Sequence, residues 1–254
     1  MTNTTTIQNK EGRDGKPQNV LPGREELPNA LPGRGKPRNA PQRQENPQNV
    51  PPKIKFCGLK RAEDIEMANA LKIDYAGFVF AKKSRRYVPW ELAEQLRGLL
   101  APEIQAVGVF VNEDICSVAE LIKRGIIDIV QLHGNEDEAY IRKLRELAAC
   151  PVIKAFRIDS EEDCQKAQNS SADFVLLDSG SGGTGECFDW SMIRRMERPY
   201  FLAGGLDARN VRLAVEQLHP YALDVSSGIE TDGKKDGAKM KEFANAVRCD
   251  IALA

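Results

Sequence analysis

Eight short apolar runs, separated by stretches of helical period, constrain what this 254-residue chain can fold into. Near-continuous apolar, β-branched runs are typical of strands buried on both faces of a parallel sheet. The intervening period is clearest at Met240, Phe243, Ala244 and Val247, which recur at i, i+3, i+4 and i+7 of a helix. The runs span residues 53–57, 74–80, 104–111, 128–133, 152–156, 173–178, 200–204 and 222–227.

The alternation predicts an α/β protein in which residues 53–254 form a (β/α)8 barrel of the TIM type. A doubly wound open sheet is the alternative. The barrel fold predicts where a functional site lies, because catalytic residues in this fold are found at the carboxyl ends of the strands and in the loops that follow them. Candidate site residues are therefore sought there.

Residues 1–52 differ from the rest of the chain. They hold nine of the 14 prolines but no aromatic residue and no cysteine, and the phrases PQNV and LPGR each occur twice. Such a segment buries too little apolar surface to offset its chain entropy, which predicts a disordered leader with some polyproline II character. It is either a dispensable tail or inserted repeat, or a docking arm for a partner.

Charge and cysteine usage exclude several functional classes. The chain carries 36 basic and 37 acidic residues, so no overall field recruits nucleic acid or an anionic membrane. No apolar run approaches the ~20 residues of a membrane helix, and the first residues contain no secretory h-region. The six cysteines form no CxxC or Cys/His spacing, which predicts reduced thiols, no metal and a cytoplasmic setting.

Cys57 and Asp178 are candidates for proton transfer. Cys57 ends the first run and is followed by Gly58; a free cysteine is usually a small buried hydrophobe, but here the thiol could also act as a nucleophile or proton carrier. Asp178 ends the sixth run and could act as an acid or base, or cap the segment that follows. Together they suit a reaction in which one group removes a proton and the other donates one.

Two further strand ends carry polar candidates. Residues 82–86 include four basic side chains, which form either a solvated loop or an anion-binding loop with Arg86 at its end. His133 ends the fourth run and is a candidate substrate contact; no second ligand is spaced to make it a metal site. His219 precedes Pro220 and is expected to be structural.

Small residues follow the sixth, seventh and eighth runs. Residues 179–185 contain four glycines but match neither the P-loop nor the dinucleotide fingerprint. Each loop alone could be a tight turn; together, ahead of helix starts, they predict a phosphate site. The small residues after the seventh and eighth runs are at 203–205 and 226–228.

Seven motifs, each at a strand end, resemble the phosphoribosylanthranilate isomerase family of tryptophan biosynthesis. The resemblance runs from about Lys53 to Arg248, and the leader has no counterpart in it. The motifs are KFCGLKRAEDI (55–65), GFVFAKKSRRYV (77–88), VGVFVNE (107–113), VQLHGNE (130–136), LLDS (176–179) with GGTGECFDW (182–190), LAGGL (202–206) and DVSSGIE (224–230).

The resemblance implies an Amadori rearrangement of N-(5-phosphoribosyl)anthranilate to 1-(o-carboxyphenylamino)-1-deoxyribulose 5-phosphate, without a cofactor. It assigns the general base to Cys57, the general acid to Asp178 and anthranilate binding to Arg86. The phosphate-binding residues that it implies are Gly183, Thr184, Gly185, Gly204, Gly205, Ser226, Ser227 and Gly228. We expect helix N-termini and the basic loop to offset the negative charge that the phosphate brings near the thiol. No long exposed apolar helix face stands out, so we expect a monomer.

Three other barrels remain as alternatives. An indole-glycerol-phosphate synthase would need a lysine where Cys57 ends its strand, although Lys55 lies two residues earlier. A ribulose-phosphate epimerase would need paired acids and metal-binding histidines. A non-catalytic phosphosugar-binding barrel would need no facing acid and base. Activity toward the related aminoaldose of histidine biosynthesis is also open, since it uses the same proton moves.

Overall fold

The computed structural model describes Met1, residues 51–178, Trp190 and residues 192–248. Almost all of the predicted leader, residues 1–52, therefore lies outside the described residues, as do Gly183, Thr184 and Gly185 of the predicted phosphate site. The boundary at residue 52 stays a prediction.

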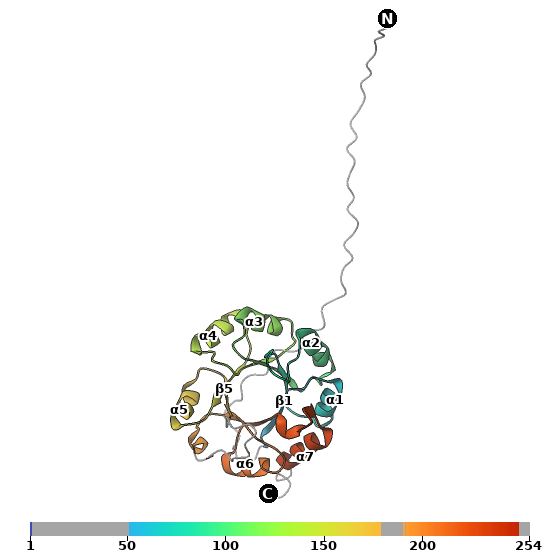
Figure 1. The fold of residues 1–254 in the computed structure, drawn as a ribbon. Helices are drawn as coiled ribbons and strands as arrows, with labels where there is room; N and C mark the ends of the chain where they lie inside the picture. The colour runs from blue at the N-terminus through green and yellow to red at the C-terminus, as the bar shows by residue number, and fades with distance from the viewer. Residues whose placement is uncertain (2–50, 179–189, 191, 249–254) are drawn as a thin grey trace. The chain divides into compact units, whose positions relative to one another are not determined.

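Eight parallel strands close into a barrel in the order β1 to β8 (Figure 1). Closure is made by β1 and β8, where Lys55 lies opposite Asp224 and Phe56 opposite Val225. The predicted barrel is confirmed, and the open doubly wound sheet is excluded. The strands are β1 (Lys53–Cys57), β2 (Tyr75–Val79), β3 (Gln105–Phe110), β4 (Ile129–Leu132), β5 (Val152–Arg157), β6 (Phe174–Asp178), β7 (Tyr200–Ala203) and β8 (Ala222–Val225).

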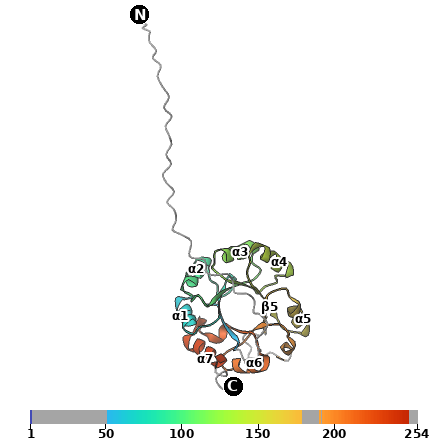
Figure 2. The same cartoon turned by 180° about the vertical axis from the view of Figure 1, so that it is seen from behind.

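The helices form a ring around the strands (Figures 1 and 2). Several begin at side chains that satisfy free backbone N–H groups: Asp114 accepts from Cys116 and Ser117, and Ser160 accepts from Asp163. The helices are α1 (Ala62–Ala70), α2 (Trp90–Leu99), α3 (Ile115–Lys123), α4 (Glu138–Leu147), α5 (Glu161–Asn169), α6 (Val211–Leu218) and α7 (Gly237–Arg248). His219 ends α6 in the left-handed conformation, which fits a structural role.

Two of the predicted strand–helix units differ from the simple repeat. After β6 the described residues contain a 3-10 turn, η1 (Ile193–Arg195), in place of an α-helix. After β8, a 3-10 turn η2 (Ser227–Ile229) and a hairpin of β9 (Glu230–Thr231) and β10 (Lys234–Lys235) precede α7. The hairpin turns at Asp232-Gly233, both with positive φ, the dipeptide that a two-residue hairpin favours.

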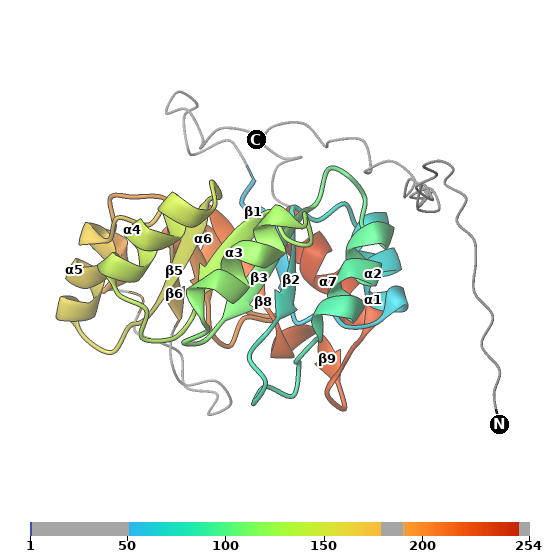
Figure 3. The same cartoon turned by 90° about the horizontal axis from the view of Figure 1, so that it is seen from above.

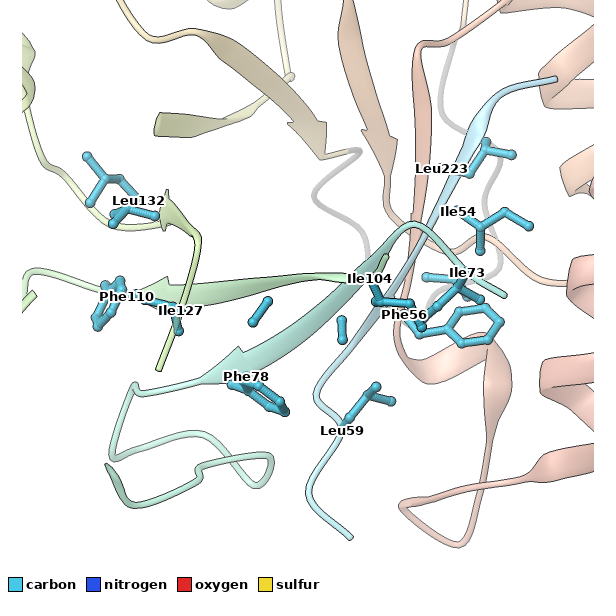
Figure 4. Packing of buried hydrophobic residues seen from close by; sticks show 14 of the residues in the cluster. Ile54, Phe56, Leu59, Ile73, Phe78, Ile104, Phe110, Ile127, Leu132 and Leu223 are labelled. Atoms are coloured by element: carbon cyan, nitrogen blue, oxygen red, sulfur yellow. The ribbon is translucent and has the colours of Figure 1, made fainter. Parts of the chain in front are cut away.

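Alternate residues of each strand face opposite sides of the barrel wall. Outward residues such as Ile54, Phe56 and Phe78 pack in a continuous core under the helices (Figure 4). Inward residues such as Val107, Ile153 and Leu176 fill the interior. Cys57 and Asp178 share this inward alternation, at the end where both strands finish.

The amino-terminal end of the barrel is closed by aromatic rings. Tyr75 and Phe201 lie 5.3 Å apart between ring centroids, and Phe174 stacks on Tyr221 at 5.1 Å. The hydroxyl groups of Tyr75 and Tyr221 are 3.0 Å apart. This end is packed solid, which leaves the opposite end for a site.

Two further observations bear on the sequence predictions. Cys57, Cys116, Cys150 and Cys164 are free thiols, in keeping with the expected reduced state of these four. Within the part of the chain that the structure describes, no helix is long and apolar enough to cross a membrane.

Candidate active site

Cys57 lies at the mouth of the barrel, as the last residue of β1. Its side chain belongs to a small apolar cluster with Val79 of β2 and Val109 of β3, and the residue is 9% exposed. Across the β1–β2 ladder its partner is Gly77, which has no side chain to cover the thiol. The thiol is therefore largely buried but sits at the rim of the interior.

The charges around Cys57 act in opposite directions. Burial raises the pKa of the Cys57 thiol, while the ammonium groups of Lys55 and Lys235 lower it and the Asp224 carboxylate raises it. The balance leaves the pKa above the usual value, so the thiol is protonated at neutral pH. The cations that act on the thiol are Lys55, two residues earlier on the same strand, and Lys235 of the β9–β10 hairpin. The expectation that helix N-termini and the basic loop at residues 82–86 offset the charge of a bound phosphate stays a prediction.

Asp178 and His133 lie together at the mouth of the barrel. His133 Nε2 is 3.4 Å from Asp178 Oδ2, and both side chains are about one-third exposed. On its other side, His133 Nδ1 is 3.1 Å from Gln131 Nε2. Both residues line a cavity of about 600 Å³, together with Lys154, Phe156 and Arg157. The structure thus brings two sequence-predicted residues into direct reach of each other.

The rim beside His133 is held by an ion pair that sequence reasoning missed. Lys154 Nζ donates to the Gly134 carbonyl oxygen at 2.6 Å and lies 3.2 Å from Glu136 Oε2. Glu136 also accepts from the backbone N–H groups of Asn112 at 2.6 Å and Gly134 at 2.9 Å. This pair ties together the loops after β3 and β4, and so fixes the backbone that carries His133.

Arg86 is anchored by a second missed residue, Glu230. Arg86 donates from Nε to Oε1 at 2.7 Å and from Nη2 to Oε2 at 2.9 Å. Lys235 Nζ donates to the same carboxylate at 2.8 Å. These two cations hold the pKa of Glu230 down at about 2, against the opposing effect of burial. The Asp232-Gly233 turn signal could have predicted the hairpin that brings Glu230 and Lys235 together.

The loops after β7 and β8 pack directly against each other. A Cβ atom on Gly228 would lie 1.9 Å from the Leu206 carbonyl oxygen, so only glycine allows this approach. Gly204 and Gly205 adopt positive φ, and Ser226 Oγ donates to the Cys57 carbonyl oxygen at 3.0 Å. Ser227 is exposed and begins η2, a short extra helix of the kind that phosphate sites in this fold use.

These observations define a class of protein. A barrel whose interior is packed at one end presents a thiol, a carboxyl group and a histidine at the other, beside an arginine and two closely packed small-residue loops. In the described residues no group of three or more His, Cys, Asp and Glu side chains is arranged to hold a metal ion. The class is that of (β/α)8-barrel enzymes with acid–base groups at the carboxyl ends of the strands.

Comparison with known proteins identifies the family within this class. A family model described as N-(5'phosphoribosyl)anthranilate (PRA) isomerase matches residues 54–246. The N-(5'-phosphoribosyl)anthranilate isomerase of Endomicrobium trichonymphae is 46% identical over 201 residues, which cover 78% of this chain and 98% of that protein. The chain therefore belongs to the N-(5'-phosphoribosyl)anthranilate isomerase family, a family of enzymes.

Solved structures agree with this assignment. The crystal structure of phosphoribosyl anthranilate isomerase from Thermotoga maritima has 37% sequence identity and a TM-score of 0.71, and the match covers 78% of this chain and 99% of that one. A further crystal structure, of a phosphoribosyl anthranilate isomerase in complex with reduced 1-(o-carboxyphenylamino)-1-deoxyribulose 5-phosphate, has 36% identity and a TM-score of 0.69, with the same coverage.

Proposed function

We propose that this protein converts N-(5'-phosphoribosyl)anthranilate into 1-(o-carboxyphenylamino)-1-deoxyribulose 5-phosphate, with Cys57 as general base and Asp178 as general acid. The observation that carries the proposal is that these two side chains occupy the inward face at the same end of the barrel, on strands β1 and β6. Support for the substrate comes from family membership and from the reduced product analogue named with a relative.

The proposed reaction breaks one C–O bond and otherwise moves protons, and its atoms balance without a cofactor. Asp178 donates a proton to the ring oxygen of the furanose, and the C1′–O bond breaks to give a Schiff base. The Cys57 thiolate then removes the proton from C2′, which leaves an enolamine. This enolamine tautomerises to the aminoketose, and the two side chains exchange their protons with solvent before the next turnover.

The neighbours of the pair have roles in this scheme. His133, 3.4 Å from Asp178, would orient the carboxyl group toward the sugar and contact the substrate. Arg86, held by Glu230, would bind the anthranilate carboxylate. The loops that contain Gly204, Gly205, Ser226, Ser227 and Gly228 would hold the phosphate, together with residues 183–185.

The test is a turnover assay with N-(5'-phosphoribosyl)anthranilate, followed by the loss of anthranilate-type fluorescence. The wild type should turn over, and Cys57→Ala and Asp178→Asn should each reduce kcat by about 10²–10⁴-fold. Circular dichroism and the unfolding midpoint should stay close to wild type, because both positions lie at the rim of the mouth. A wild type that binds the substrate without converting it would instead support the non-catalytic phosphosugar-binding barrel.

A further inference from the structure

The layer of the barrel interior directly beneath Cys57 contains an ion pair in place of apolar side chains. Lys55 is fully buried, and its Nζ is 2.8 Å from Oδ1 of Asp224, which is 8% exposed. Elsewhere the interior is filled by residues such as Val107, Ile153 and Leu176. A buried ion pair is seldom worth more to stability than a well-packed apolar pair, so stability does not account for this one.

The ammonium group of Lys55 lies against the thiol. The ammonium group of Lys55 and the thiol of Cys57 act electrostatically on each other. Both face the same wall of the barrel, because a Cβ atom on Gly77 would be 3.0 Å from Cys57 Sγ and 3.2 Å from Lys55 Nζ. The absence of a side chain at Gly77 leaves room for both groups.

The other charged groups around the thiol are accounted for. Asp224 of β8 acts on Cys57 through space with the sign opposite to Lys55. Lys235 of β10 also favours the thiolate, but it is engaged at 2.8 Å with Glu230, which binds Arg86 as well. On β2 the residue facing the thiol is Gly77, which carries no charge.

We propose that the Lys55–Asp224 pair sets the ionisation of Cys57: Lys55 stabilises the thiolate from below, and Asp224 holds Lys55 in place and limits that stabilisation. Both are positioning residues, since they act through Cys57 and lie beneath it in the interior. The inference rests on the proposed function, in which the Cys57 thiolate is the base. It adds that the Lys55 ammonium group is the positive charge that stabilises this thiolate.

The experiment measures thiolate formation without relying on turnover. The full-length protein is alkylated with iodoacetamide across a range of pH, and the rate at Cys57 is followed by mass spectrometry of the tryptic peptide that contains it. Alkylation reports the thiolate, because the thiol itself is a poor nucleophile. Cys116, which is exposed on α3, serves as a reference whose profile should not differ between variants.

Removing the Lys55 charge and removing the Asp224 charge should shift the pH profile of Cys57 alkylation in opposite directions. Lys55→Met should slow alkylation of Cys57 about tenfold at a fixed pH below the midpoint and move the midpoint to higher pH. Asp224→Asn should accelerate alkylation and move the midpoint to lower pH. The matched control is Lys53→Met, which removes a lysine of the same strand that is paired with Asp74 at the same 2.8 Å distance, away from the thiol; it should leave Cys57 unchanged.

A double variant keeps the test informative if one of the single variants fails to fold. Lys55→Met with Asp224→Asn replaces the ion pair by two uncharged side chains of similar size. It should shift the midpoint to higher pH, but by less than Lys55→Met does, because the opposing effect of the Asp224 carboxylate is lost as well. A Cys57 profile equal to wild type in Lys55→Met or in the double variant, or shifts of the same sign in Lys55→Met and Asp224→Asn, would overturn the proposal.

Failure of the proposed function would look different. If Cys57→Ala retains wild-type turnover, then Cys57 is not the base, whatever the alkylation profiles show. If Cys57→Ala is inactive but the alkylation profile of Cys57 is the same in Lys55→Met as in the wild type, then Cys57 is the base, but Lys55 does not stabilise its thiolate.

Discussion

Arg86 and Glu230 form a two-pronged ion pair across the mouth of the barrel, with Nε–Oε1 at 2.7 Å and Nη2–Oε2 at 2.9 Å. The residues come from the loop after β2 and from the hairpin after β8, so the pair joins two loops on either side of β1. Lys235 completes the group through its 2.8 Å contact with Glu230. This arrangement fixes the direction of the Arg86 guanidinium at the end of the barrel where the loop after β2 and the hairpin with β9 project (Figure 3). Arg86 is the group that we propose binds the anthranilate carboxylate.

Glu230→Gln should lower the free energy of unfolding by about 1–3 kcal/mol at neutral pH, because it removes charge-assisted hydrogen bonds from a largely buried group. The pKa of Glu230 is lowered from 4.5 to about 2 in the folded protein. Its stabilisation is therefore fully present above pH 4.5 and is lost as the pH falls toward 2. Urea unfolding at several pH values should show the difference between wild type and variant shrinking over this interval. A difference that is constant with pH would contradict the assignment.

Asp178→Asn should change the shape of the pH profile as well as its height. In the wild type the base must be deprotonated and the acid protonated, and the thiol pKa is raised by burial. Between the two pKa values these requirements cancel, so kcat/KM should be nearly independent of pH there and should fall on either side of this range. Without the acid, the residual kcat/KM should rise about tenfold per pH unit up to the thiol pKa. A residual activity that does not rise with pH would contradict Cys57 as the base.

His133→Asn should reduce kcat by about tenfold, in keeping with the loss of one polar contact worth about 1.4 kcal/mol to the proposed acid, from which His133 Nε2 is 3.4 Å away. The effect should be much smaller than that of Asp178→Asn, because the carboxyl group itself remains. His219→Asn is the matched control: this histidine ends α6 and should leave kcat unchanged. Equal effects at the two histidines would contradict a role for His133 beside Asp178.

Gly228→Ala should separate the loops after β7 and β8, since its Cβ would lie 1.9 Å from the Leu206 carbonyl oxygen. We expect a loss of about 1–3 kcal/mol in stability from the forced backbone shift and a raised KM for the phosphorylated substrate. Gly98→Ala, in α2 with open space around its position, should be neutral or stabilising by up to about 1 kcal/mol. An unchanged KM in Gly228→Ala would argue against a phosphate site between these loops.

The barrel should be monomeric in solution. Among the described residues 51–178 and 192–248, its large exposed apolar side chains are Leu99, Val111 and Leu213, which lie on separate parts of the fold. Scattered single residues do not form the contiguous patch that a stable dimer buries. Light scattering coupled to size-exclusion chromatography should give the mass of one 28.2 kDa chain at micromolar concentration. A mass of two chains would contradict the prediction.

The order and nature of the strands could be predicted from the sequence because they are local properties. Each apolar run became a strand within two residues of its predicted bounds. The ends of the first and sixth runs correctly placed Cys57 and Asp178 at strand ends, and the structure adds that alternation along β1 and β6 turns both side chains inward. The hairpin after β8 was missed although the Asp232-Gly233 dipeptide signals it, because the helical period was followed directly into the last helix.

The partners of these residues were decided by the tertiary structure alone. Lys55 meets Asp224 only because β1 and β8 close the barrel, 169 positions apart in the chain. Arg86 contacts Glu230 across 144 positions of the chain. This contact fixes the position of one guanidinium in the basic loop. The pattern of apolar residues that predicts a strand is a property of local sequence. The pKa of a buried thiol depends instead on charged groups within a few ångströms in space, and closure of the barrel determines which groups these are.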